Sequence, residues 1–376
     1  MRHPTILAVA ALALVVPVAA GIELGQGRHT AAPVAIDQVR EALAEGYYRP
    51  VPASVLALHS VGAMISALGD PYTAYLGAPQ YLQLRRDTEA SYSGIGVGLL
   101  PSSRGLVVVS LRPGPASRAG VRVGDTIVRI GDVPVSRLNM SQALAGISGP
   151  VGTRVRIVLR RADRELTFTM RRSLVHAPVV EGRLLAFAGR GWGVVRLSAF
   201  TFGAAQVLAR ELHALQREGV AGFVLDLRDN PGGLLTQAVG VSSLFLDRGV
   251  VASLVGAHRP RQVLQAGPGS VTKLPLAVLV DRYSASSAEI VAAALRDHRR
   301  AILVGERTFG KALVQAIDPL GNGDALELTV ARYYTPLGAD ISNGGVVPQI
   351  HALDDPRTTA DEGLTAALRA LARPAS

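Results

Sequence analysis

The sequence predicts a layered α/β core that carries an inserted, barrel-like β domain and is preceded by a helical segment. Between residues 174 and 350, apolar strands alternate with helices, which is typical of a layered α/β core. Residues 91–173 contain short strands, a hairpin and glycine-rich turns, the pattern of a small β domain. Residues 23–90 carry apolar positions at helical spacing. The length of 376 residues fits two or three such domains.

The N-terminus has the pattern of an export signal. Arg2 and His3 precede an apolar run, Ile6 to Ala20, that ends in small residues. Within residues 1–22, the stretch from Thr5 to Ile22 is also nearly long enough to span a membrane, so the segment could remain as an anchor. We therefore expect an exported chain that is periplasmic, extracellular or anchored to the outer face of the cytoplasmic membrane. Cleavage of this segment stays open.

Composition excludes several kinds of site. The chain has no cysteine, so disulfides, Cys-bound zinc and a Cys nucleophile are ruled out. We expect neither a metal nor a cofactor. The formal net charge is +10, but the arginines are scattered and aromatic residues make up only 5%, which argues against a nucleic-acid partner. Two readings of the charge stay open: affinity for an anionic surface such as an acidic membrane face, or an arginine-rich composition from a GC-rich coding sequence.

In the helical segment we expect one helix over Ala35–Tyr47 and a second over Ala53–Leu68, with a break at Gly69. The β domain is expected to contain these elements: strands Leu106–Leu111 and Asp125–Ile130, helices Ala116–Ala119 and Leu138–Ile147, and a hairpin of Arg154–Arg160 with Glu165–Met170.

The expected strands of the core are Gly193–Leu197, Phe223–Leu227, Leu276–Val280, Ile302–Val304, Leu313–Ala316 and Ala325–Tyr334. The expected helices are Ala204–Glu218, Gln237–Leu246 and Ser286–Asp297. Residues 351–376 are assigned to a C-terminal tail. The strands 223–227 and 276–280 are continuously apolar, which predicts burial on both faces.

The loop Asp226–Gly233 follows the first of these buried strands and ends in Gly232 and Gly233. Without Cβ atoms in the way, backbone N–H groups of tandem glycines can point at a ligand, as an oxyanion hole requires. The alternative is an ordinary turn, because Asn-Pro-Gly-Gly has strong turn chemistry by itself.

The loop Asp281–Glu289 joins the second buried strand to a helix. Ser286 at the start of that helix can expose its hydroxyl as a nucleophile, and the helix N-terminus favours developing negative charge. The alternative is a helix cap, since Ser286 and Glu289 have the spacing of a capping box.

The loop Gly305–Lys311 precedes an apolar strand that would bury the lysine amine. Burial lowers the pKa of a lysine, which can then act as a base. The alternative is a surface lysine, although Lys273 is the only other lysine of the chain. The loop obliges no carboxylate to pair with Lys311. None of the eight histidines lies in a recognisable catalytic loop.

Together these loops resemble the carboxy-terminal processing peptidases, also called tail-specific proteases, over roughly residues 60–350. The resemblance is carried by these segments: Leu68-Gly69-Asp70-Pro71-Tyr72-Thr73, Ser93-Gly94-Ile95-Gly96, Pro115–Val121, Gly124–Ile127, Asp226–Gly233, Gly305–Lys311, Val314-Gln315 and Gly345–Pro348. It implies a crotonase-like layered protease core and identifies the inserted domain as a PDZ domain.

The resemblance also implies the roles of the site residues. The family's nucleophile lies 25 residues before its lysine, which selects Ser286 as nucleophile and Lys311 as base. Gln315 would hydrogen-bond the lysine amine. The oxyanion hole would use the N–H of Ser287 together with that of one of the tandem glycines, Gly232 or Gly233. Two residues depart from the family pattern: Ser and Ala are exchanged at 287 and 288, and Ala312 stands where glycine is usual.

The PDZ domain would bind free, apolar C-termini of protein or peptide substrates through a loop of Gly94, Ile95, Gly96 and Val97. Without the resemblance this loop reads as a glycine-rich strand entry. The function expected is an exported serine endopeptidase. The alternatives are a non-catalytic tail-binding protein of the same fold and an acyl-CoA enzyme with a similar core. Substrate, activator and oligomeric state, a homo-oligomer included, stay open.

Overall fold

The computed structural model describes residues 36–89, 91–162, 164–176, 178–342, 344–354, 357–358 and 360–373, so the expected export segment lies outside the described residues. The chain divides into two compact units, one of residues 89–178 and one of residues 1–88 with 179–376. In the described parts, no helix is both long enough and apolar enough to cross a membrane.

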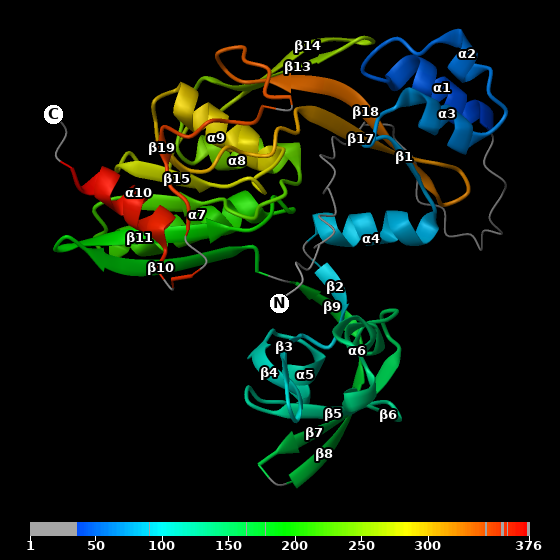
Figure 1. Cartoon of the computed structure of the whole chain (residues 1–376), viewed down its shortest axis with the longest axis vertical. Coiled ribbons are helices and arrows are strands. Elements are labelled where there is room, and N and C mark those ends of the chain that lie inside the picture. Colours follow the sequence, from blue (N-terminus) through cyan, green and yellow to red (C-terminus); the bar gives the residue numbers. More distant parts are fainter. Residues whose placement is uncertain are drawn as a thin grey trace. The chain divides into compact units, whose positions relative to one another are not determined.

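The larger unit is built on a six-stranded sheet, shown in Figure 1. Its order is β10 (Val180–Phe187), β11 (Arg190–Leu197), β12 (Phe223–Asp226), β15 (Leu276–Val280), β16 (Ile302–Gly305) and β19 (Ile350–His351). The strands from β11 onward run parallel, and β10 pairs antiparallel with β11. All residues of β12 and β15 are buried, as predicted from their apolar runs.

Helices cover both faces of this sheet. One face packs against α7 (Ala204–Arg217), α8 (Leu235–Ser243) and α9 (Ser287–Asp297). The other face packs against α10 (Glu362–Ala372), which buries Leu364, Ala367 and Leu368. The segment assigned to a C-terminal tail therefore carries a core helix. Its apolar residues at positions 364, 367, 368 and 371 have helical spacing, which is the signal in the sequence that indicates this helix.

A second sheet in the same unit contains β1 (Ala74–Leu76), β13 (Val250–Gly256), β14 (Arg259–Gln265), β17 (Leu313–Pro319) and β18 (Ala325–Tyr334). Of these, β1, β13 and β14 were not predicted. The N-terminal helix α1 (Ile36–Gly46) packs on β18, and α4 (Ala78–Thr88) follows β1. The helical segment is thus part of the larger unit.

The single helix expected over 53–68 is wrong. The structure has two helices there, α2 (Ala53–Leu56) and α3 (Val61–Leu68). Ser60 separates them, because its side chain accepts a hydrogen bond from the N–H of Ala63 and so begins α3 as an N-cap. The expected end at Gly69 is confirmed, since this residue adopts the left-handed conformation at φ 63°.

The smaller unit contains a sheet in the order β3 (Val97–Ser102), β4 (Gly105–Leu111), β5 (Thr126–Ile130), β7 (Arg154–Arg161) and β8 (Arg164–Arg171), with β6 (Val133–Pro134) beside β5. It also contains the pair β2 (Ser91–Gly94) and β9 (Ser173–His176) and the helices α5 (Pro115–Ala119) and α6 (Met140–Ile147). Among the described strands β3 and β8 are edges, so the expected barrel-like closure is not seen.

Candidate active site

The three loops singled out in the sequence follow β12, β15 and β16, which are neighbours in one parallel sheet. The carboxyl ends of parallel strands share one edge, so the three loops begin side by side. The structure therefore brings together segments that lie up to 311 − 226 = 85 residues apart in the chain.

Ser286 lies at the start of α9 in a strained conformation. Its backbone has φ 57° and ψ −115°, a region that residues with a Cβ rarely adopt, and the residue is fully buried. The expected helix cap is only half present. The Glu289 carboxylate accepts the N–H of Ser286 at 2.8 Å, but the Ser286 hydroxyl makes no hydrogen bond to any described residue. Capping therefore leaves this hydroxyl free.

Glu289 connects the serine loop to the lysine loop. Its Oε2 accepts the N–H of Ser286 at 2.8 Å and the N–H of Lys311 at 2.9 Å. Its Oε1 accepts the N–H of Gly310 at 2.7 Å and the hydroxyl of Thr308. Burial raises the pKa of Glu289, and these four donors oppose that rise. One buried carboxylate thus sets the separation of the two backbones, a role that the sequence did not reveal.

Tyr333 forms a second connection between the same two residues. Its hydroxyl donates to the carbonyl oxygen of Lys311 at 2.8 Å and lies 3.3 Å from that of Ser286. The ring is almost fully buried in the core of the larger unit. The serine and the lysine are therefore held together from two sides by side chains of α9 and β18.

Lys311 is only 3% exposed, which contradicts the reading as a surface lysine. Its Nζ lies 4.6 Å from the centre of the Tyr72 ring. Burial lowers the pKa of Lys311 to about 8, against the opposing charges of Glu327, Asp70 and Glu289. Tyr72, Asp70 and Glu327 come from the N-terminal region and β18. Spacing within the lysine loop gives no sign of these distant neighbours.

Gln315 is fully buried on β17. Its amide nitrogen donates to the hydroxyl of Thr329 at 3.2 Å. Its amide oxygen has no hydrogen-bond partner within the described residues. A buried amide oxygen without a hydrogen-bond donor destabilises the folded protein. This oxygen can therefore accept a hydrogen bond from a donor that comes within reach when the conformation changes.

The two glycines pack against the serine loop. A Cβ on Gly232 would lie 2.8 Å from the Cβ of Ser286, and φ is +101°, so only glycine fits without strain. The N–H of Gly232 is already bonded to the side chain of Asn230 at 2.9 Å. The N–H groups of Gly233 and Ser287, in contrast, have no acceptor among the residues described. The Ser287 hydroxyl donates to the carbonyl of Gly233 at 2.9 Å and joins the two loops.

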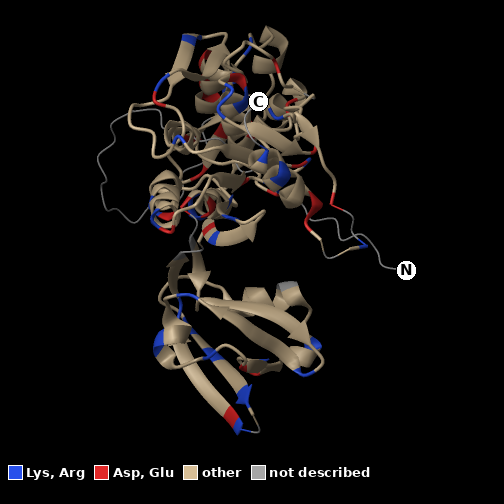
Figure 2. Cartoon of the chain, turned by 90° about the vertical axis from the view of Figure 1, so that its left-hand side faces the viewer, with Lys and Arg blue, Asp and Glu red and all other residues tan. Residues whose placement is uncertain are grey.

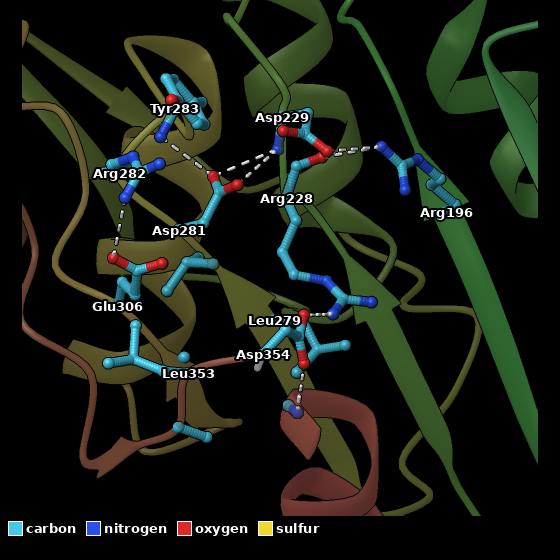
Figure 3. A pocket seen from close by; sticks show the side chains of 14 residues that line it. Arg196, Arg228, Asp229, Leu279, Asp281, Arg282, Tyr283, Glu306, Leu353 and Asp354 are labelled. Carbon is cyan, nitrogen blue, oxygen red and sulfur yellow. Dashed lines mark hydrogen bonds and ion pairs between the residues drawn. The ribbon is translucent and has the colours of Figure 1, made fainter. Parts of the chain in front are cut away.

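A cavity of about 500 Å³ opens beside these loops and is shown in Figure 3. Its lining includes Asp281, Arg282 and Glu306 from the serine and lysine loops, but neither Ser286 nor Lys311. The charges on its wall pair with one another, as Arg282 does with Glu306 at 4.0 Å. Arg228 connects its own loop, Asp226–Gly233, to the C-terminal region through ion pairs with these carboxylates: Asp226, Asp354 and Asp361.

In the smaller unit, the loop proposed to bind C-termini connects β2 to the edge strand β3. Gly96 has φ +84°, and Ile95 is buried. Within the described part of the chain, the N–H groups of Ile95 and Gly96 have no acceptor. The loop therefore has two free donors next to an unpaired strand edge.

Comparison with known proteins gives a consistent result. Residues 191–352 match peptidase family S41 and residues 107–161 match a PDZ domain. The chain is 35% identical over 295 residues to a carboxyl-terminal-processing protease of Synechocystis sp., which covers 77% of this chain and 69% of the relative. It is 31% identical over 320 residues to the carboxy-terminal processing protease CtpA of Bacillus subtilis, covering 84% and 68%.

A solved structure, a photosystem II D1 C-terminal processing protease, aligns with a TM-score of 0.57 and 29% identity. The alignment covers 90% of this chain and 97% of that one. The reading as an acyl-CoA enzyme finds no support in these matches. The chain therefore belongs to the carboxyl-terminal processing proteases of peptidase family S41 and is a serine-type peptidase with a PDZ domain.

Proposed function

We propose that the chain is an exported endopeptidase that cleaves peptide bonds with Ser286 as nucleophile and Lys311 as general base. The carrying observation is that both backbone N–H groups bind the same oxygen of Glu289 while both side chains are buried. A base must be partly unprotonated near neutral pH, and a pKa of about 8 meets that condition.

In the proposed reaction, the neutral amine of Lys311 takes the hydroxyl proton of Ser286 as Oγ attacks the peptide carbonyl carbon. The tetrahedral intermediate then collapses, the C–N bond breaks, and the lysine ammonium gives its proton to the leaving amine. Water next attacks the carbonyl carbon of the acyl-enzyme ester while the neutral lysine accepts its proton. The ester C–O bond then breaks, the lysine ammonium returns the proton to Ser286 Oγ, and the new carboxyl end leaves. Apart from the attacking water, no group outside the chain is required for proton balance.

The oxyanion of the intermediate would be bound by the N–H groups of Ser287 and Gly233. Their lack of acceptors supports this choice, whereas the N–H of Gly232 is occupied by Asn230. Gly232 would contribute by allowing the loop to approach Ser286 closely. Ser287 also lies in the first turn of α9, where the helix dipole favours negative charge.

Gln315 would accept a hydrogen bond from the Lys311 amine through its free amide oxygen. Such a bond orients the amine toward the serine hydroxyl and is available to both its neutral and its charged form. The bond of its amide nitrogen to Thr329 fixes which end of the side chain is presented.

We further propose that the PDZ domain recognises free, apolar C-termini of unstructured proteins. A tail would pair with the edge strand β3, and its carboxylate would bind the free N–H groups of Ile95 and Gly96. Export, with membrane association through residues 1–22, follows from the apolar N-terminal run. A homo-oligomer stays compatible with these assignments.

Mass spectrometry of the fragments released from a denatured protein tests the cleavage function. The wild type should yield new C-termini, and Ser286→Ala should yield none while keeping the same thermal unfolding temperature. Fragments produced at a substantial rate by purified Ser286→Ala would reject the nucleophile and point to Ser284 or Ser287.

A further inference from the structure

The positive charge of the chain is concentrated in the smaller unit. Residues 89–178 contain 13 arginines, no lysine and 5 acidic residues, a formal charge of 13 − 5 = +8. The rest of the chain has 39 − 13 = 26 basic and 29 − 5 = 24 acidic residues, a formal charge of +2. The unit therefore carries most of the total of +10. Figure 2 shows basic residues spread over its strands with few acidic ones between them.

This distribution decides between the two readings of the charge. A GC-rich coding sequence would raise the arginine content along the whole chain. The larger unit nevertheless balances its arginines with an almost equal number of carboxylates. An excess of arginine that is confined to residues 89–178 therefore reflects a property of that unit and not of the coding sequence. A net charge of this size attracts anionic surfaces.

Register places five of these arginines on one side of the sheet. Side chains of residues paired across strands point to the same face. By this rule the following residues share a face, here called the basic face: Arg129 of β5, Arg154, Arg156 and Arg160 of β7, and Arg171 of β8. All five are exposed. The opposite face is buried in the core of the unit through residues such as Ile127 and Ile157.

The basic face is only partly neutralised from within. Two of its arginines have acidic partners at the surface, Arg156 with Asp132 at 3.5 Å and Arg160 with Glu165 at 3.3 Å. Arg154 lies directly opposite Arg171, and neither forms an ion pair with a described residue. Like charges directly opposite each other on a sheet are destabilising. An external anion on this face would relieve that repulsion.

We propose that the basic face binds the surface of a membrane that contains anionic lipids. On this face, β8 presents the short side chains Thr167 and Thr169 between Glu165 and Arg171, so they do not hold the charges away from a flat surface. The apolar run at Ile6–Ala20 is suited to the same surface. The edge strand β3 stands at the other end of the sheet order, so tail binding and membrane binding use different strands. This inference does not depend on the Ser-Lys mechanism.

The test is a sedimentation assay of the full chain with two kinds of vesicle, phosphatidylcholine alone and the same lipid with about one third phosphatidylglycerol. The ratio of the two partition coefficients cancels the apolar contribution of the N-terminus. We expect stronger binding to the anionic vesicles that fades with added salt. The triple variant Arg154→Gln, Arg156→Gln and Arg171→Gln should lower the ratio by on the order of 100-fold, about fivefold for each arginine.

A matched control removes the same charge from exposed arginines of the larger unit: Arg190→Gln, Arg210→Gln and Arg217→Gln. It should leave the ratio nearly unchanged, and both triple variants should hydrolyse a soluble peptide at the wild-type rate. Equal losses in the two variants would overturn the proposal, because net charge alone would then explain binding. A wild-type ratio near one would also overturn it. So would binding to duplex DNA that is tighter than to anionic vesicles and is lost in the first variant.

Discussion

Replacing Glu327 with Gln should make the enzyme active at lower pH. Glu327 is the strongest of the carboxylates that oppose the lowering of the Lys311 pKa. Burial raises its own pKa to about 7, so about nine tenths of it is ionised at pH 8, where Lys311 titrates. Removing this charge weakens the electrostatic effect that opposes the lowering of the Lys311 pKa by burial. The pKa of Lys311 should therefore fall, by on the order of one unit for the loss of one close carboxylate.

The size of the effect follows from the neutral fraction of the amine. With a pKa of about 8, about one tenth of Lys311 is neutral at pH 7; with a pKa one unit lower, about one half is neutral. Because only the neutral amine accepts the serine proton, kcat/KM at pH 7 should rise about fivefold. At pH 9 almost all of the amine is neutral in both proteins, so their rates should converge.

The assay measures kcat/KM for a fluorogenic, unstructured peptide between about pH 5.5 and 10. This range contains the ascending limb of the pH profile, where Lys311 loses its proton. Glu306→Gln is the matched control, because Glu306 lies in the lysine loop but pairs with Arg282 rather than acting on Lys311. Its limb should coincide with that of the wild type. A Glu327→Gln limb that stays in place or moves to higher pH would refute the reasoning.

Three further changes give distinct results. Gly232→Ala should reduce kcat by about 100-fold or more, because the new methyl group meets Ser286 and φ is unfavourable for alanine; wild-type turnover would reject close packing there. Tyr72→Leu removes the ring that faces the charged lysine amine and should move the pH limb downward, whereas Tyr72→Phe should keep it near that of the wild type. A substrate peptide with an amidated C-terminus should be cut more slowly, since it lacks the carboxylate that we propose binds the free N–H groups of the PDZ loop. Equal rates for both peptides would remove the PDZ domain as the tail reader.

Much of the core was predictable because its strands are apolar throughout and its helices have clear spacing. The strands β12 and β15 and the helix α9 occur within one or two residues of the expected positions. The edge strand β14 was not predicted because six of its seven residues are exposed and its sequence lacks the alternation of apolar and polar residues that indicates a strand. Local patterns report burial, which explains the miss at β14 but not the miss at β13, where Val251 to Leu254 are buried.

The candidate site shows a similar division. Its loops could be predicted because glycines and small residues that directly follow buried strands are typical of functional loops. The neighbours of Lys311 could not be predicted in this way. Asp70 and Tyr72 lie more than 200 residues before Lys311 in the chain, and Glu327 lies on the strand β18. Glu289 was noticed only as a cap partner of Ser286. Its bonds to Gly310 and Lys311 depend on tertiary contacts that spacing does not encode.

The most direct test of the Ser-Lys proposal is labelling with a fluorophosphonate probe, followed by peptide mapping of the adduct. The probe should modify Ser286 alone, at a rate that rises with pH as Lys311 loses its proton. In Lys311→Arg, where the side chain cannot be deprotonated, labelling should fall to background although the charge is kept. Modification of Ser284 or Ser287, or labelling of Lys311→Arg at the wild-type rate, would contradict the account.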